Sequence, residues 1–384
     1  MEFGAPIREL FALEAGAAFL NHGSYGATPR VVLEAQTGWR ERLERQPVRF
    51  FSRDLEGLLD AALQELATFL RVQARDLVFV DNATTGVNAV LRSVPLQPGD
   101  EVLTTDHVHP AVRRALEHLT AVVGARLVVA DVPFPLEGPG AVVAAVERAL
   151  TPRTRLALLD HITSFTALIY PVEELIGLCH ARGVPVLLDG AHVPGMLDVN
   201  VEALGADWFT GNCHKWLFAP KGCAFLWTSP AHQSTLHPPV VSIFHGEGLH
   251  REFGWTGTRD PSAWLSVTTA LEFLRELGPR QVRTHNHGLA LAGARTLAAA
   301  WERELPAPDS MFGSMVPLLL PGEISPTQEA GDALNDRLWR RHHIEAPVYP
   351  FKERMWLRIS AQVYNDPSQY AALAGAVLEE LETA

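Results

Sequence analysis

"VPVLLDGAH", residues 184–192, is an almost wholly apolar run that ends in a carboxylate, two small residues and a histidine. Similar short runs lie on either side of it, at 101–105, 125–132, 154–162, 206–211 and 222–227. Helical patterns separate them, at 55–70, 85–94, 109–119, 140–150 and 171–182. Apolar strands that alternate with amphipathic helices predict an α/β fold with a mostly parallel sheet covered on both faces. Ligands of such sheets bind beyond the carboxyl ends of the strands, where Asp189 and His192 lie.

The last third of the chain has a different pattern. Helices are predicted at 262–277 and 280–304, followed by a Pro-rich link, and then by elements at 315–320, 327–341, 346–349, 355–360 and 367–382. This mixture is typical of a smaller α+β domain. A chain of 384 residues exceeds what one hydrophobic core usually supports. We therefore predict a large domain over 1–261 and a small domain over 262–384.

Composition narrows the choice of partner and compartment. The formal net charge of −12 disfavours nucleic acid and anionic membranes as main partners. The chain has three cysteines, Cys179, Cys213 and Cys223, and no CxxC pair, which fits a reducing compartment. Neither a secretory signal nor an apolar run of about 18 residues is apparent. We expect a cytoplasmic protein without a membrane partner.

Four stretches carry candidate chemistry. In "DNATTGVNAVL" (81–91), Thr84 and Thr85 open a helix whose N-terminus can bind a phosphate, although a plain N-cap is the better explanation when this stretch is taken alone. Asp189 ends a buried strand, where a carboxylate needs a cation or several donors, in a site or in a structural ion pair. Lys215, in "GNCHKW" (211–216), is either a desolvated nucleophilic amine or a lysine that extends to solvent. "FGWTGTRDPS" (253–262), which contains Thr258, reads alone as a turn and a cap.

Together these stretches supply what pyridoxal phosphate requires. The cofactor needs an amine for its aldehyde, a carboxylate for its ring nitrogen, and a helix N-terminus with hydroxyls for its phosphate. The order along the chain is phosphate loop, Asp189, and Lys215 26 residues later. We therefore predict a pyridoxal-phosphate site with an amino acid as substrate.

The motifs also resemble a known family. "FLNHGSYGATPR" (19–30), "HITS" (161–164), "DGAH" (189–192) and "GNCHKWLFAPKG" (211–222) are similar to fold type I enzymes of the class V aminotransferase group, above all to the isopenicillin N epimerase-like subgroup. The resemblance spans nearly the whole chain. It implies a seven-stranded, mostly parallel sheet and a homodimer with shared active sites.

The resemblance also implies a role for each matching residue. Lys215 would bind the cofactor as a Schiff base, Asp189 would pair with the ring nitrogen, and His109 would stack on the ring. The other implied cofactor contacts are Ser164 and His192 at the phenolic oxygen, Thr84, Thr85, Asn212 and His214 at the phosphate, and Thr258 at the phosphate of the other subunit.

Substrate recognition is predicted to involve the small domain. Arg358, in "MWLRISAQVYNDPSQY" (355–370), resembles the family's carboxylate-binding residue, and a guanidinium suits a carboxylate. The alternative is a solvent-facing arginine on a half-exposed strand. Asn21 and His22 are predicted to line the same cleft. The His107-x-His109 spacing lacks a third ligand, so no metal is expected.

The reaction is left open between three outcomes. Lys215 can act as the base in epimerisation, in β-elimination of a C–S bond and in transamination. We favour an epimerase, because His109 is a candidate second acid, with the C–S lyase next and the aminotransferase third. A persulfide-forming desulfurase is disfavoured, because no cysteine follows Cys223. The alternative from another class is a cofactor-binding protein without turnover, disfavoured because Lys215, Asp189 and Arg358 occur together.

Overall fold

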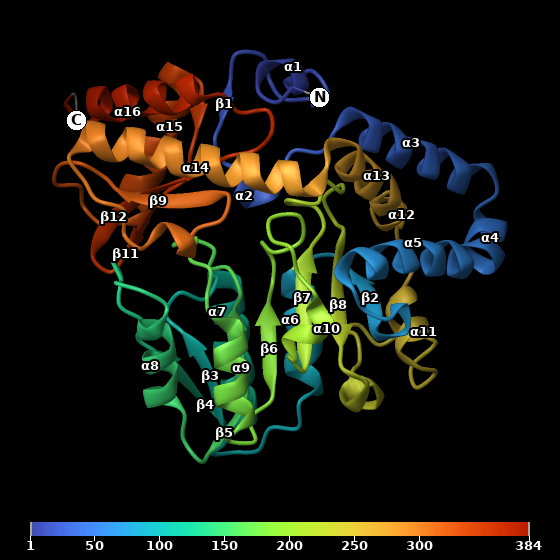
Figure 1. The fold of residues 1–384 in the computed structure, drawn as a ribbon. Helices are drawn as coiled ribbons and strands as arrows, with labels where there is room; N and C mark the ends of the chain where they lie inside the picture. Colours follow the sequence, from blue (N-terminus) through green and yellow to red (C-terminus); the bar gives the residue numbers. More distant parts are fainter. Residues whose placement is uncertain (1, 383–384) are drawn as a thin grey trace.

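The six predicted strands and β2, which was not predicted, form one seven-stranded sheet in the order β2-β8-β7-β6-β5-β3-β4. The computed structural model describes residues 2–382 (Figure 1). Only β8 runs antiparallel to its neighbours, so the prediction of a mostly parallel α/β sheet is confirmed. The strands are β2 (Leu77–Val80), β3 (Glu101–Thr105), β4 (Arg126–Ala130), β5 (Thr154–Asp160), β6 (Val186–Asp189), β7 (Trp208–Asn212) and β8 (Ala224–Thr228).

Helices cover both faces of this sheet, as the apolar strands require. On one face, α6 (Ala83–Ser93) and α7 (Pro110–Val123) pack on alternate strand residues such as Leu158 and Leu187. On the other face, α8 (Gly140–Ala149) and α9 (Val172–His180) pack on the intervening residues, including Leu159 and Leu188. Asp160 and Asp189 continue the alternation of Leu158 and Leu187, so both belong to the face that α6 and α7 cover.

The small domain is a three-stranded antiparallel sheet backed by helices. Its strands have the order β11-β12-β9. The long helix α14, orange in Figure 1, packs against α16 and β9. The elements are α14 (Pro279–Trp301), β9 (Met315–Leu319), α15 (Gln328–His342), β11 (Val348–Phe351), β12 (Arg354–Ser360) and α16 (Pro367–Glu382).

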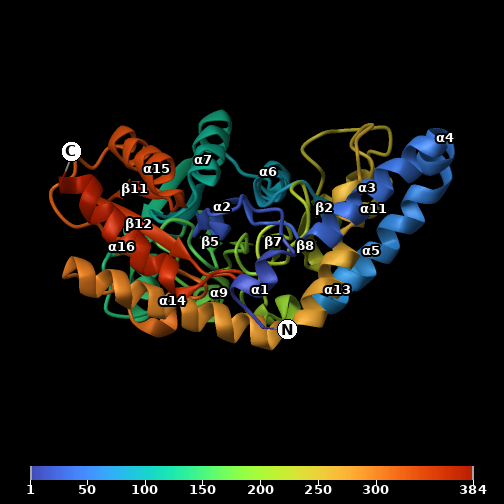
Figure 2. The same cartoon turned by 90° about the horizontal axis from the view of Figure 1, so that it is seen from above.

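Two sets of contacts cross the domain boundary that was expected at residue 262. Helices α12 (Ser262–Leu265) and α13 (Val267–Leu277) pack on α3 (Arg30–Arg45) and α5 (Leu55–Leu70), so they belong with the large domain (Figure 2). The short strand β1 (Ala18–Phe19) instead pairs with β10 (Ile344–Glu345) of the small domain. Local sequence patterns do not report such long-range pairing, so the expectation missed both features.

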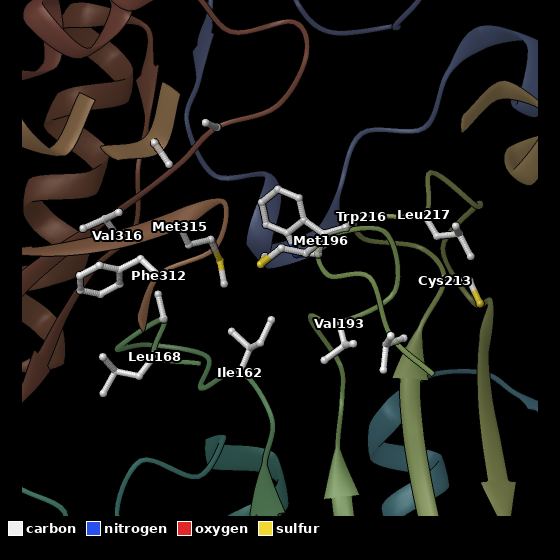
Figure 3. Close-up of a cluster of buried hydrophobic side chains, with 14 of the residues drawn as sticks. Ile162, Leu168, Val193, Met196, Cys213, Trp216, Leu217, Phe312, Met315 and Val316 are labelled. Atoms are coloured by element: carbon white, nitrogen blue, oxygen red, sulfur yellow. The ribbon is translucent and has the colours of Figure 1, made fainter. Parts of the chain in front are cut away.

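An apolar cluster joins the domains directly above the sheet. Figure 3 shows Ile162 and Val193, on the loops after β5 and β6, facing Phe312 and Met315 of the small domain, with Trp216 nearby. Backbone bonding reinforces the junction, because the Ile169 N–H donates to the Met311 carbonyl at 2.8 Å. The loops that follow the central strands are therefore held against the small domain. No helix among residues 2–382 has the length and apolar character to cross a bilayer.

Candidate active site

A pocket lies at the carboxyl ends of β5, β6 and β7, beside the N-termini of α6 and α7. Seven of the predicted site residues line it directly, and Thr85 and His214 lie next to lining residues in the chain. The lining consists of Ala83, Thr84, His109, Val112, Asp160, Ile162, Ser164, Asp189, Ala191, His192, Asn212 and Lys215.

Lys215 follows β7 and is buried, with 8% of its surface exposed. The alternative of a lysine that extends to solvent is therefore excluded. Burial lowers the pKa of Lys215 to about 7, the cation of Arg358 adds to this effect, and the carboxylate of Asp189 opposes it. A large share of Lys215 is therefore the free, nucleophilic amine at neutral pH.

Two neighbours set the hydrogen bonding of this amine. Trp216 donates from Nε1 to Nδ1 of His192 at 3.3 Å. Burial holds the pKa of His192 well below its usual range, so the ring is neutral. Because Nδ1 accepts, Nε2 carries the hydrogen, and this atom lies 3.1 Å from Nζ of Lys215. The lone pair of Lys215 is thus the acceptor, which requires the neutral amine.

Asp189 is the last residue of β6 and is 4% exposed. Its Oδ1 accepts a hydrogen bond from the Ala191 N–H at 2.9 Å. Burial raises the pKa of Asp189, while this bond and Lys215 lower it. A cationic ring N–H bound beside Asp189 would supply the charge partner that a buried carboxylate needs. The residue therefore fits the nitrogen of pyridoxal phosphate.

The start of α6 is built to face the cavity. Asn82 caps the helix by accepting from Thr85 N at 2.9 Å, and Asn212 at the end of β7 accepts from Ala83 N at 2.9 Å. The helix lies close to β7, because a Cβ on Gly86 would stand 2.3 Å from Oγ1 of Thr210. The positive end of the helix and Thr84 thus meet at the cavity, which suits a phosphate.

His214 has a more limited role than expected in this state. Its Nδ1 donates to the Cys223 carbonyl at 3.1 Å. Burial lowers the pKa of His214 to about 4. The neutral ring then presents an acceptor at Nε2, so a hydrogen bond to phosphate requires that His214 take up a proton.

His109 lines the pocket, but one nitrogen of its ring already accepts a hydrogen bond from the backbone. It is the N-cap of α7, and its Nδ1 accepts from the Ala111 N–H at 3.2 Å. Burial lowers its pKa to about 4, so the ring is neutral. His107 turns to other partners: its Nδ1 lies 2.6 Å from Thr166 Oγ1, and its Nε2 lies 3.2 Å from the Val132 carbonyl.

Arg358 lies in β12 and is only 3% exposed, which excludes the solvent-facing alternative. Its guanidinium donates to the Ser164 carbonyl, to Ser24 Oγ at 3.3 Å and to Asn21 Oδ1 at 3.4 Å. All three partners are neutral oxygens. A buried cation in such company favours a bound anion, and the α-carboxylate of an amino acid is the matching ligand.

The structure separates the two N-terminal candidates. Asn21 contacts Arg358, as described above, and also donates to Glu345 at 3.1 Å. His22 is fully buried, with Nδ1 2.7 Å from Tyr364 Oη and Nε2 3.0 Å from the Lys215 carbonyl. This position gives His22 a structural role, supporting the backbone of Lys215, in place of the expected contact with substrate. Thr258 is exposed, away from this cavity.

The sequence analysis missed Asp160. This residue ends β5, lines the cavity and is 2% exposed. The signal was present, because "TRLALLDHI" ends an apolar run in a carboxylate just as "VPVLLDGAH" does. Another overlooked signal is that the chain has only three lysines, Lys215, Lys221 and Lys352.

The fold and the site together define a fold type I pyridoxal-phosphate enzyme. The chain matches the family model "Aminotransferase class-V" over residues 27–319 and belongs to that family. Pyridoxal phosphate is accordingly its cofactor, as the arrangement of Lys215, Asp189 and α6 requires.

Individual relatives carry different activities. The chain is 34% identical to a putative L-cysteine desulfhydrase of Oryza sativa subsp. japonica, over 95% of this chain and 83% of that protein. It is 35% identical to an isopenicillin N epimerase of Streptomyces clavuligerus, over 93% of each. Among solved structures, a mutant of C-DES with glycine covalently linked to its PLP cofactor superposes with a TM-score of 0.82 at 22% identity, over 96% and 98% of the chains.

Proposed function

We propose that this class V enzyme is a pyridoxal-phosphate-dependent lyase that cleaves the C–S bond of a small sulfur-bearing amino acid. The observation that carries the proposal is the state of His109. Epimerisation was favoured because His109 was a candidate second acid, but a neutral ring whose Nδ1 caps α7 has no imidazolium proton to deliver at neutral pH. Lys215 is left as the base at the reacting centre.

Elimination requires only this one residue. Bound pyridoxal phosphate makes the α-proton of an amino acid acidic by accepting electrons into its protonated ring. Nζ of Lys215 takes that proton, since a pKa near 7 leaves the amine free. The resulting ammonium returns a proton to the departing sulfur. With cysteine and one water, the products are sulfide, ammonia and pyruvate.

The charge of the site supports an amino-acid substrate. Arg358 offers its guanidinium to the α-carboxylate, and Asn21 and Ser24 accept hydrogen bonds from its Nη2. The similarity to curated L-cysteine desulfhydrases agrees with this choice.

Epimerisation is the second candidate. It is supported by the 35% identity to isopenicillin N epimerases, which covers 93% and 98% of this chain. In that case Lys215 would have to serve both faces of the α-carbon, because His109 is neutral. Transamination is the third candidate. Like elimination, it would need only Lys215, which would move the α-proton of the substrate to the cofactor.

One experiment separates the three reactions. The holoenzyme is incubated in deuterated water with L-cysteine, L-cystine, L-alanine and isopenicillin N, and sulfide, keto acid, ammonia and chirality are followed together. The lyase proposal expects sulfide, pyruvate and ammonia in equal amounts from L-cysteine. Deuterium-labelled D-product without keto acid would reject it in favour of epimerisation. Absence of turnover with every substrate would reject catalysis on this substrate class.

We also propose that the enzyme is a homodimer whose subunits share active sites. Thr258 is exposed in a single chain. The preceding segment presents Val240, Val241 and Ile243 to solvent, with 55%, 68% and 76% of their surfaces exposed. Such an apolar surface next to Thr258 is suited to burial against a second copy. Thr258 would then contact the phosphate bound by the partner.

A further inference from the structure

We propose that Asp160 is a second carboxyl of the cofactor site and that it stays protonated and neutral beside the charged Asp189. Asp160 is then a positioning residue, which acts on the cofactor by way of Asp189. The inference goes beyond the proposed reaction, because it concerns the cofactor site that epimerase, lyase and aminotransferase would share.

The geometry of the sheet brings the two carboxyls together. Asp160 and Asp189 are direct partners in the register of the parallel strands β5 and β6. Residues paired in this way point to the same face of the sheet. Both side chains are buried and both line the cavity that holds Lys215. Two carboxyls so close cannot both carry a charge without a cation between them.

The hydrogen bonds decide which carboxyl holds the proton. Asp189 accepts from the Ala191 N–H at 2.9 Å, and this hydrogen bond stabilises its charged form. Oδ2 of Asp160, in contrast, is buried without a hydrogen-bond partner in the described part of the chain. Burial raises the pKa of Asp160 well above its usual range, and the charge of Asp189 raises it further. The proton therefore resides on Asp160.

The other titratable groups near Asp160 do not reverse this assignment. Lys215 and His109 line the same cavity, but His109 is neutral and Lys215 has its lone pair directed to His192. Tyr170, on the segment before α9, is also buried, and burial raises its pKa well above the usual range. The adjacent His161 is neutral, because burial lowers its pKa to about 4. The surroundings of Asp160 thus supply no cation.

A neutral Asp160 has a specific consequence for the cofactor. The pair carries a single negative charge, which matches the single positive charge of a protonated ring nitrogen. Oδ2 of Asp160 has no partner among residues 2–382, so its O–H would be free to turn to Asp189 when the cofactor is bound, and a donor to a carboxylate stabilises the charged form. Asp160 would thereby keep Asp189 ionised in a buried site, which is the state that holds the ring nitrogen protonated.

The first test locates the proton in the cofactor-free protein. Infrared spectra at neutral pH are compared for wild type, Asp160→Asn, Asp189→Asn and Asp76→Asn. Asp76 is a matched control, because it is a buried carboxyl before β2 that bonds Gln233 at 2.6 Å, far from the cavity. The carbonyl band of a protonated carboxyl is expected to vanish only in Asp160→Asn. A band that survives there and vanishes in Asp189→Asn would overturn the assignment, as would identical spectra of wild type and Asp160→Asn.

The second test measures the dissociation constant of pyridoxal phosphate between pH 5 and 9. Asn resembles a neutral carboxyl that carries a hydrogen-bond donor, so the dissociation constant of Asp160→Asn is expected to remain within about 3-fold of the wild-type value. If Asp160 were charged, its loss would instead raise the dissociation constant about 10-fold for each pKa unit of lost interaction. Asp160→Ala removes the donor and is expected to bind about 10-fold more weakly. Weakening of Asp160→Asn beyond about 10-fold, or wild-type affinity in Asp160→Ala, would overturn the proposal.

Discussion

At the scale of single residues, the chemistry depends on the protonation state of Lys215. Its amine faces Nε2–H of His192, which is fixed by the bond from Trp216 to Nδ1. A free amine is needed twice, once to capture the cofactor's aldehyde and once to remove the α-proton. The local surroundings thus prepare the residue for both tasks before any ligand binds.

This state predicts the pH dependence of cofactor capture. The rate at which cofactor-free protein gains the absorbance of bound pyridoxal phosphate should rise with pH, because only the neutral amine attacks. It should level off above about 7, the pKa of Lys215, whereas an ordinary lysine would continue to gain up to about 10.4. Arg358→Met should move the midpoint to higher pH, because the cation of Arg358 lowers this pKa. A wild-type midpoint above about 9 would contradict the account.

Replacement of Arg358 is expected to weaken substrate binding and to stabilise the ligand-free protein. It is a buried cation surrounded by neutral oxygens. Arg358→Met should raise KM for the amino acid by roughly 100-fold, equivalent to about 2.7 kcal/mol, through loss of the carboxylate contact. The same change should increase the free energy of unfolding of the ligand-free protein by about 1 kcal/mol, because an unpaired buried charge is removed. Urea unfolding and steady-state kinetics measure both; an unchanged KM would contradict the role of Arg358.

Position in the predicted fold singled out Thr84, which begins a helix, and Asp189, which ends a strand, and both line the pocket because parallel strands bring their carboxyl ends to one edge. Lys215 was singled out by its apolar surroundings, and Asn212 only by the family resemblance. Sequence reasoning did not identify the role of His22, which depends on bonds to Tyr364 and to the Lys215 carbonyl, over 190 residues away along the chain. Such partners are set by tertiary packing, which local patterns do not encode.

At the scale of elements, the N-terminal segment is a support for the lysine loop. Gly26 follows α2 (His22–Tyr25) with a φ of 71°, and a Cβ there would stand 2.4 Å from the His214 carbonyl. The segment therefore packs directly on the backbone of the loop that carries Lys215. The helices and strands that were predicted between 55 and 230 lie within a few residues of their observed bounds, whereas α3, β2 and this contact were not predicted. Short irregular segments lack the periodicity on which such predictions depend.

A pair of glycine substitutions tests this support. Gly26→Ala should lower the free energy of unfolding by about 2–4 kcal/mol, through the left-handed backbone and the backbone clash. It should also weaken cofactor binding, because the lysine loop must move. Gly38→Ala is the control, since nothing lies within 4 Å of its added Cβ on helix α3, and it should raise stability by about 0.5–1 kcal/mol. Equal stability of both variants would show that the contact is unimportant.

At the scale of the whole molecule, the proposed site draws on both domains and, in the proposed homodimer, on a second subunit. The small domain contributes Arg358, the large domain contributes the cavity, and the apolar cluster of Figure 3 joins them. The sequence did not predict that α12 and α13 pack on α3 and α5, because the periodicity of a helix does not identify its packing partner. The proposed sharing of sites between subunits lies beyond a single chain.

Mixed dimers test this sharing. Lys215→Ala and Thr258→Val are each expected to bind pyridoxal phosphate poorly as pure proteins. The two variants are unfolded and refolded together, so that chains pair at random and about half of the dimers are mixed. Each mixed dimer has one intact site, with Lys215 from one chain and Thr258 from the other. Wild-type affinity for pyridoxal phosphate should therefore return at about one site in four overall. Absence of any recovery, with dimers verified by light scattering, would contradict the contribution of Thr258 across the interface.

The central claim is that Lys215 holds the cofactor covalently. The small number of lysines in the chain makes a labelling test easy to interpret. Only Lys221 and Lys352 compete as side-chain amines; the first donates to Thr28 at 3.1 Å, and the second pairs with Asp106 at 2.8 Å. Protein reconstituted with pyridoxal phosphate is reduced with borohydride, digested and weighed by mass spectrometry. The account predicts one added pyridoxyl phosphate, on the peptide that contains Lys215. Labelling at Lys221 or Lys352 instead, or no label at all, would contradict it.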